Sequence, residues 1–424
     1  MQKKAVIVLG AGMPIAWGGP LTSKITNELL KCEEFLTKDN QSLAKYIQNH
    51  LAKYHNCSND QIHFEYIINS LETISDYLHS EVSKGNSPQF TGSAPAWFSL
   101  SEAYSAFENF RFEPIQELGV GFLLNLAKPF DTAEQTPNHN YKSIYIRKVI
   151  EHYLTIIRRC IGTYDNIDQI KQNEKENTEL VNFYHNLKEL GYTVRFYTTN
   201  YDDLVPNIYS LMNTTKLFQG FTEDYSGRLF PNINKILTED HFDCHYNLHG
   251  SIYWQTGTNE MFDSSFWYTP GMPISYPISH AEYTNPTEHT SIYNIITGFN
   301  KLQKVSIEPL KAFFTTLSND CINADLIVTI GYSYSDIHIN RSLEYGTKHG
   351  HAKFLHITWS SNFFGSQEYI NMQGRTIKGG IENYSTIKDA CIITNDNKAI
   401  IYTKGFGDFL NKKDWKKILE QLKL

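Results

Sequence analysis

The stretch AVIVLGAG, residues 5–12, is a continuous apolar run that ends in a glycine pair around one alanine. An unbroken apolar run is typical of a parallel strand buried on both faces of a sheet. Gly10 and Gly12, on either side of Ala11, would let the backbone turn tightly and approach a pyrophosphate closely. A tight turn without a ligand explains these glycines equally well, because the third glycine of the dinucleotide-binding fingerprint is absent. No small-residue cleavage pattern follows the run, so we expect a buried strand rather than a secretory signal.

Helical spacing dominates the chain between residues 20 and 190. Apolar residues recur at intervals of three and four, as from Phe64 to Ile74 and from Ile146 to Ile157. Each of these sets would line one face of a helix. Two breaks that are rich in polar residues and proline, residues 85–95 and 129–140, are expected to be exposed loops.

Strand patterns return directly after this helical segment. Gly191 would end a helix over Leu180–Leu190 and lead into a strand, and a helix that feeds a strand is typical of α/β proteins. The segment 255–290, rich in Pro, Gly, Thr and Tyr, is expected to be a long irregular excursion. The later strands are expected at residues 192–197, within 243–252, at 324–330 and at 354–358.

Together these patterns predict an α/β protein with a Rossmann-like parallel sheet and a long helical insertion. A chain of 424 residues is long enough for one elaborated domain or for two. We expect a discontinuous core, residues 1–20 and 191–405, a helical insertion at residues 21–190, and a C-terminal helix at residues 406–424.

The composition excludes several classes of protein. Apolar residues make up 41% and charged residues 20%, which excludes a largely disordered chain. The formal net charge is −7 without a long basic stretch, so we expect no direct contact with nucleic acid. No apolar stretch reaches the length of about 18 residues that spans a bilayer, so we expect no membrane association and a cytoplasmic location. The cysteines are scattered without a C-x-x-C pair, which predicts neither a disulfide framework nor a metal site.

Polar segments follow three of the predicted strands, at the edge where such sheets bind nucleotides. Burial of the polar side chains of Thr198–Asp203 costs free energy unless partners satisfy them or they bind a ligand. Alternatively, one of these residues, such as Asp203, could simply cap a helix. His249 lies beside Gly250, which leaves room for a substrate, but a lone histidine is more often structural. The hydroxyl groups of Gly331–Asp336 could donate to phosphate or ribose oxygens, or a Ser or Asp there could cap a helix.

The order of these segments resembles that of the sirtuin family, in its bacterial sirtuin-like branch. Residues 296–301 and 331–340 look like that branch rather than like the deacetylases. The similarity is confined to islands between residues 5 and 345, and their order is much more specific than any one of them. The shared segments are Gly10-Ala11-Gly12, Thr199-Asn200-Tyr201-Asp202, Leu248-His249-Gly250 and Gly331-Tyr332-Ser333.

This resemblance implies an enzyme that binds NAD as its substrate, without a metal, and breaks the bond between nicotinamide and ribose. In this branch the outcome is often hydrolysis, which depletes cellular NAD as an abortive-infection defence against phage. By position, Asn200 would order the attacking water and the ribose, Asp202 would hold the nicotinamide carboxamide, and His249 would be the general base toward a ribose hydroxyl. An ordered water and a neutral imidazole suit a transition state in which positive charge builds on the ribose. The residues implied to bind NAD are Gly10, Ala11, Gly12, Thr199, Gly331, Tyr332 and Ser333.

The chain departs from the family pattern in two places. Met13-Pro14 stands where the family has a small or hydroxyl residue, which predicts a differently shaped pyrophosphate turn. Sirtuin deacetylases also have a four-cysteine zinc module, and its paired cysteines are absent here. Peptide deacetylation is therefore disfavoured.

Two functions other than an NAD⁺ glycohydrolase stay open. The chain could be a regulatory subunit that binds NAD or ADP-ribose without cleaving it. The helical insertion and aromatic segments such as Phe266–Tyr268 offer surface for a homo-oligomer, or for a ring-forming translocase-type ATPase as the resemblance allows. Protein deacetylation or ADP-ribosyl transfer, the other alternative, would depend on an acyl-lysine or another acceptor.

Overall fold

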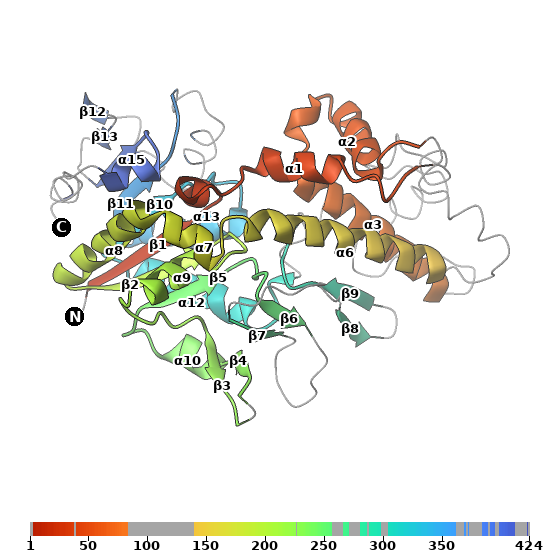
Figure 1. Cartoon of the computed structure of the whole chain (residues 1–424). Coiled ribbons are helices and arrows are strands. Elements are labelled where there is room, and N and C mark those ends of the chain that lie inside the picture. The colour runs from red at the N-terminus through yellow and green to blue at the C-terminus, as the bar shows by residue number, and fades with distance from the viewer. Residues whose placement is uncertain are drawn as a thin grey trace.

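The computed structural model has an eight-stranded sheet at its centre (Figure 1). The strand order is β12-β13-β14-β11-β10-β1-β2-β5, and the strands from β14 to β5 run parallel. The antiparallel strands β12 (Tyr384–Lys388) and β13 (Cys391–Thr394) complete one edge. The parallel strands are β1 (Lys3–Leu9), β2 (Tyr192–Thr198), β5 (Cys244–Asn247), β10 (Leu326–Ile330), β11 (Lys353–Ile357) and β14 (Ala399–Tyr402). The structure describes residues 3–37, 40–83, 140–225, 227–256, 266–270, 280–285, 288–297, 304–361, 369, 372, 384–388, 391–394, 398–411 and 422.

The first strand lies in the interior of the sheet, between β2 and β10. Its side chains alternate between two hydrophobic clusters: Ala5, Ile7 and Leu9 pack into one, and Val6 and Val8 into the other. Because both faces of the sheet are covered, neither set of alternating side chains can be polar there, and the strand is apolar from Ala5 to Leu9. The predicted buried parallel strand is confirmed, as are the strands expected at 192–197, within 243–252, at 324–330 and at 354–358.

Helices cover both faces of this sheet. α12 (Leu310–Ile322) and α13 (Ile337–Glu344) pack into the cluster that contains Val8. α8 (Glu174–Glu189), α9 (Leu204–Leu211) and α15 (Phe406–Asn411) pack into the other cluster. A mostly parallel sheet between two helical layers is a Rossmann-like α/β arrangement, so the predicted fold class is confirmed at this level.

The connection from β1 to β2 is long although the two strands are neighbours. Apart from α8, its described helices are η1 (Met13–Trp17), α1 (Thr22–Leu30), α2 (Leu43–Tyr54), η2 (Asn59–Gln61), α3 (Phe64–Ser83), α6 (Asn140–Gly162) and α7 (Ile167–Gln172). α3 and α6 pack along each other and extend to one side of the sheet (Figure 1). The loops expected at residues 85–95 and 129–140 lie outside the described residues, except for Asn140, which begins α6. α8 lies before residue 190 but packs directly on β2 of the central sheet. The division of the chain at residue 190 stays a prediction.

The expectation of an irregular segment at residues 255–290 was wrong where the structure describes it. β6 (Trp254–Thr256) and β7 (Phe266–Tyr268) join β3 (Phe221–Glu223) and β4 (Leu229–Pro231) in an antiparallel sheet of order β3-β4-β7-β6. β8 (His280–Asn285) and β9 (Glu288–Ile292) form a separate two-stranded sheet. The pair Leu229 and Tyr268 joins β4 to β7 across a long stretch of chain, and no local pattern indicates such a pair.

Several narrower expectations also have an outcome. Met13-Pro14 begins the short helix η1, with Gly12 at its N-cap position, and the expected difference from the family's pyrophosphate turn stays a prediction. All cysteines are free, as the scattered pattern predicted. None of the helices in the described part of the chain is long and apolar enough to cross a membrane. Of the helix expected at residues 406–424, α15 covers the first part, and residues 412–421 lie outside the described residues.

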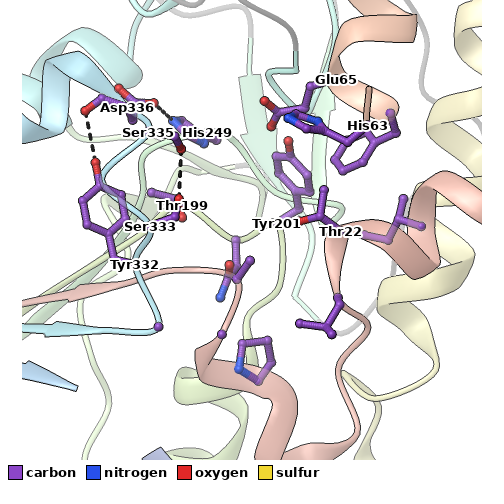
Figure 2. Close-up of a pocket in the computed structure, with 18 of the residues that line it drawn as sticks. Thr22, His63, Glu65, Thr199, Tyr201, His249, Tyr332, Ser333, Ser335 and Asp336 are labelled. Atoms are coloured by element: carbon purple, nitrogen blue, oxygen red, sulfur yellow. Dashed lines mark hydrogen bonds and ion pairs between the residues drawn. The ribbon is translucent and has the colours of Figure 1, made fainter. Parts of the chain in front are cut away.

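The loops that leave the carboxyl ends of neighbouring strands come together at one edge of the sheet. Thr199 follows β2, while Tyr332 and Ser333 follow β10, and Figure 2 shows these residues close to one another. Parallel strands deliver all their carboxyl ends to the same edge, which is where nucleotide ligands bind in such folds.

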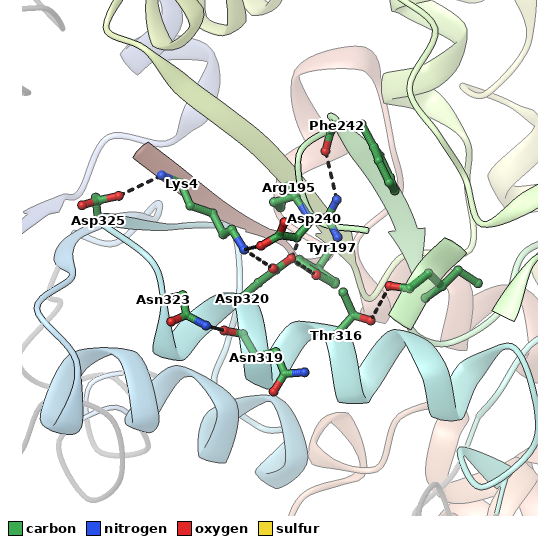
Figure 3. Close-up of polar contacts among 11 residues, drawn as sticks. Lys4, Arg195, Tyr197, Asp240, Phe242, Thr316, Asn319, Asp320, Asn323 and Asp325 are labelled. Atoms are coloured by element: carbon green, nitrogen blue, oxygen red, sulfur yellow. Dashed lines mark hydrogen bonds and ion pairs between the residues drawn. The ribbon is translucent and has the colours of Figure 1, made fainter. Parts of the chain in front are cut away.

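A buried charge cluster joins the strands toward their opposite ends (Figure 3). Asp320 on α12 accepts hydrogen bonds from the Lys4 ammonium at 2.8 Å, the Arg195 guanidinium at 2.7 Å and the Tyr197 hydroxyl at 2.5 Å. Arg195 is fully buried, and Asp320 is its ion-pair partner. Lys4 also reaches Asp240 at 3.1 Å, whose side chain is largely exposed. One carboxylate therefore ties α12 to both β1 and β2.

We predict that Asp320→Asn lowers the free energy of unfolding by about 3–5 kcal/mol, because it leaves the Arg195 charge buried without its counter-ion. Urea denaturation of both proteins measures this difference. Asp240→Asn removes a partner of the same Lys4 at an exposed position, and should cost no more than about 1 kcal/mol. Equal losses in the two variants would contradict the burial argument.

Candidate active site

Two glycine turns interlock beneath the carboxyl edge of the sheet. The N–H of Gly12 donates to the carbonyl oxygen of Gly331 at 2.9 Å. A Cβ atom at Gly10 would lie 2.4 Å from that same oxygen, and a Cβ atom at Gly12 would lie 2.8 Å from the Gly331 Cα. Gly331 has φ +59°, in the left-handed region that favours glycine. The turns after β1 and β10 can therefore lie this close together only because Gly10, Gly12 and Gly331 have no side chain.

A cavity of about 750 Å³ opens above these turns (Figure 2). Its volume lies within the range of small-molecule sites, roughly 300–1,000 Å³. Gly10 and Asp202 do not line the cavity, but all the other site residues expected from the sequence do. These are Ala11, Gly12, Thr199, Asn200, His249, Gly331, Tyr332 and Ser333.

Asn200 is held at the cavity wall by the end of β1. Its side-chain Nδ2 donates to the carbonyl oxygen of Gly10 at 3.1 Å, and its backbone N–H donates to the Thr198 hydroxyl at 3.0 Å. The N–H of Thr199 donates to the carbonyl oxygen of Leu9 at 2.9 Å. Gly10 thus lies behind the site rather than in it, and it fixes the orientation of the Asn200 amide.

His249 faces the cavity from the turn that follows β5. Gly250 has φ +78°, and a Cβ atom there would lie 2.2 Å from the carbonyl oxygen of Asn294, so the His-Gly pair is required for the shape of this turn. The N–H of Ile296 donates to the carbonyl oxygen of His249 at 2.7 Å. The His249 ring places Nε2 3.0 Å from the Oδ2 of Asp336.

Sequence reasoning considered Asp336 only as a helix cap. The structure confirms the cap, since Oδ1 of Asp336 accepts from the N–H of His338 in the first turn of α13. It adds the contact with His249, which joins residues 87 positions apart. No local pattern could have indicated this contact, although the strand ends that hold the two residues were both predicted.

Asp202 and Asp203 lie behind the cavity wall. Asp202 is buried, and its carboxylate accepts from the Tyr164 hydroxyl at 2.6 Å and from the N–H of Leu204 at 3.2 Å. It therefore makes the side-chain cap of α9, whereas Asp203 does not. The Asp203 carboxylate accepts instead from the Tyr268 hydroxyl at 2.8 Å.

A third carboxyl group, that of Asp165, completes a buried acidic cluster with Asp202 and Asp203. Asp165 accepts from the N–H of Asp203 at 2.7 Å and from the Tyr253 hydroxyl at 2.9 Å. Burial, followed by the charge of Asp165, raises the pKa of Asp202 to about 7 and the pKa of Asp203 to about 8. Burial also raises the pKa of Asp165. Near neutral pH the cluster therefore retains protons that these groups would lose in water.

The helical segment between β1 and β2 supplies the far wall of the cavity. Thr22 on α1, His63 before α3, and Glu65 in its first turn face the cavity across from His249 (Figure 2). Tyr164, just after α6, lines it as well. Sequence reasoning missed this wall, because apolar spacing indicates which face of a helix is buried and not which residues meet a ligand.

No protein-family model matches the chain, and no curated protein matches its sequence. In the parts of the chain that the structure describes, no group of three or more His, Cys, Asp or Glu side chains could hold a metal ion. What the cavity binds must therefore be inferred from its own residues.

We predict that Gly10→Ala lowers the free energy of unfolding by roughly 1–3 kcal/mol, because its Cβ atom collides with backbone that has no room to move. Thermal or urea unfolding measures the loss. Gly162→Ala, where nothing lies within 4 Å of the added atom, is the matched control and should not destabilise the protein. A tolerated alanine at residue 10 would contradict the interlocked turns.

The acidic cluster predicts how stability depends on pH. Folding raises the carboxyl pKa of Asp203 from about 4 to about 8, so the folded state holds a proton that the unfolded state loses. The contribution is fully present below about pH 4 and is lost as the pH rises to about 8. We expect Asp203→Asn to reduce this decline in the free energy of unfolding by an amount of the order of a few kcal/mol.

Urea denaturation across that pH window measures the decline. Asp168→Asn, at an exposed position in the first turn of α7, is the control and should leave the slope unchanged. A slope that is the same in wild type and in Asp203→Asn would show that the cluster does not retain protons.

Proposed function

We propose that this protein is an NAD⁺ glycohydrolase that produces nicotinamide and ADP-ribose. The observation that supports this proposal is the meeting of Asn200, His249 and the glycine turns at Gly12 and Gly331 on one cavity. These residues come from loops after four different strands, and they are the set that the sirtuin-like resemblance implies. The location at the carboxyl edge of a parallel sheet is also the usual place for a nucleotide.

The chemistry requires a nucleophile, a base and room for a leaving group. In the proposed reaction the bond between the ribose carbon and the nicotinamide nitrogen breaks, and its electron pair leaves with nicotinamide, which departs neutral. A water oriented by Asn200 bonds to the ribose carbon. The proton that this water loses passes to the ribose hydroxyl, which gives its own proton to His249. Positioned groups of this kind lower the barrier for charge that develops on the ribose.

The role of Asp202 in this proposal differs from the contact that the resemblance implies. Its carboxylate does not line the cavity and is bonded to the hydroxyl of Tyr164, which does. We propose that Asp202 acts through Tyr164, whose ring it holds against the space available to the nicotinamide. Asp202 is then a positioning residue rather than a ligand of the carboxamide.

The wider biological role follows from the resemblance alone. We propose that the protein belongs with the bacterial sirtuin-like NADases, acts in the cytoplasm, and depletes NAD in defence against phage. The helical segment at residues 21–190 would be an insertion that controls access, because its residues form one wall of the cavity. A homo-oligomer or a complex with a ring-forming translocase-type ATPase would provide the control, since an unrestrained NADase would poison its own cell.

We predict that purified protein consumes NAD⁺ and that Asn200→Ala or His249→Ala lowers the rate roughly 100-fold or more, because each removes a group that acts on the reacting atoms. Chromatographic detection of nicotinamide measures the rate. Asn182→Ala and His185→Ala change the same residue types on the exposed face of α8 and should keep the wild-type rate.

Three results would overturn the assignment. Equal turnover by wild type and by both cavity variants would place the reaction elsewhere. Calorimetric binding of NAD⁺ without any product, in the presence of an ATPase partner, would favour the regulatory subunit instead. A rate that depends on an acyl-lysine peptide would indicate deacetylation.

A further inference from the structure

The contact between His249 and Asp336 fixes the position of a proton. Nε2 of His249 lies 3.0 Å from Oδ2 of Asp336, and both side chains are almost fully buried, at 4% and 5% exposure. The second oxygen of Asp336, Oδ1, accepts from the backbone N–H of His338. An ionised carboxylate can only accept hydrogen bonds, so the hydrogen between Oδ2 and Nε2 must belong to the imidazole.

The remaining ring nitrogen is therefore the one available for chemistry. In a neutral imidazole only one nitrogen has a hydrogen, so an Nε2–H ring leaves Nδ1 as a lone-pair acceptor. Nδ1 of His249 makes no hydrogen bond to the described residues, and His249 lines the cavity. A base needs an unprotonated nitrogen, and this arrangement leaves Nδ1 as the nitrogen that Asp336 does not occupy.

Asp336 is itself held rigidly. The Tyr332 hydroxyl donates to the carbonyl oxygen of Asp336 at 3.1 Å and to Oδ1 of Asn340 at 2.9 Å. Nδ2 of Asn340 donates in turn to the carbonyl oxygen of Tyr334 at 2.7 Å. These buried hydrogen bonds join the loop after β10 to the first turns of α13 and hold the backbone of Asp336 in one conformation.

We propose that Asp336 is a positioning residue that holds His249 as the Nε2–H tautomer, so that Nδ1 is the atom that takes the proton from the ribose hydroxyl. The role of Nδ1 as a base rests on the proposed glycohydrolase activity, whereas the tautomer does not. When Nδ1 takes the proton, the ring becomes an imidazolium, and the carboxylate of Asp336 stabilises its charge. The ring returns to neutral when Nδ1 gives the proton to solvent.

The substitution Asp336→Asn separates this role from a merely structural one. Asparagine is as good a helix cap as aspartate, so its side-chain oxygen can still accept from the N–H of His338. Its amide NH₂ then faces Nε2 of His249 and can only donate, which favours the Nδ1–H tautomer. The variant keeps the shape and the cap but places the hydrogen on the wrong nitrogen.

The test combines nitrogen NMR with kinetics. Protein labelled with ¹⁵N-histidine reports the tautomer of His249 through ring ¹⁵N–¹H correlations, with the signals assigned by their loss in His249→Gln. We expect an Nε2–H ring in wild type and an Nδ1–H ring in Asp336→Asn. We also expect kcat of Asp336→Asn to fall roughly 100-fold or more while KM stays within a few-fold, because the base and not the binding surface is changed. Asp336→Glu, which restores an acceptor, should recover part of kcat and the Nε2–H ring.

The exposed pair of His351 and Asp325, at 3.2 Å, offers a matched control. Asp325→Asn removes the same kind of contact away from the cavity, and it should change neither the His249 signals nor kcat. An Nδ1–H ring in wild type, or an Asp336→Asn protein that keeps both the wild-type tautomer and the wild-type kcat, would overturn the proposal. If no protein cleaves NAD⁺ but wild type has the Nε2–H ring, the glycohydrolase and the base role of Nδ1 fail while the tautomer stands.

Discussion

The crossing of two glycine turns is the constraint on which the site depends. The turn after β1 and the turn after β10 approach so closely that Gly10, Gly12 and Gly331 leave no room for a Cβ atom. This contact fixes the spacing of two strand ends at the edge of the sheet. It also orients Asn200, whose side chain bonds the carbonyl oxygen of Gly10. Because only glycine allows this close backbone contact, the glycines also determine where the Asn200 side chain lies.

Two groups of buried carboxyl side chains lie near the cavity, and their surroundings differ. Asp336 holds a single imidazole in a defined orientation, whereas Asp165, Asp202 and Asp203 are neighbours of like charge that burial keeps partly protonated. The first arrangement organises a group that faces the cavity. The second lies behind the cavity wall, where tyrosine hydroxyls and backbone N–H groups connect the loop that contains Asn200 to its surroundings.

The sequence predicted the parts of this molecule that depend on local pattern. An apolar run such as residues 5–9 indicates a strand that is buried on both faces of the sheet. Because parallel strands end at the same edge, Asn200 and His249 were expected to lie close together. The antiparallel sheet that contains β7 was missed, because its strands are short and because β4 and β7, which join its two halves, are far apart along the chain. The partnership of His249 with Asp336, and the wall from the helical segment, were missed for the same reason. Hydrogen-bond partners and cavity walls are properties of the folded arrangement and leave no periodicity in the chain.

Tyr164 and Asp165 are consecutive residues just beyond α6, and both bond to the loop that contains Asn200. α6 is long, and it extends with α3 far from the sheet (Figure 1). The end of α6 is thus connected to the loop that contains Asn200 through Tyr164 and Asp165. A tilt of this long helix would change the positions of Tyr164 and Asp165 relative to Asp202 and Asp203. The packing around α6 is in this way linked to the residues behind the cavity wall.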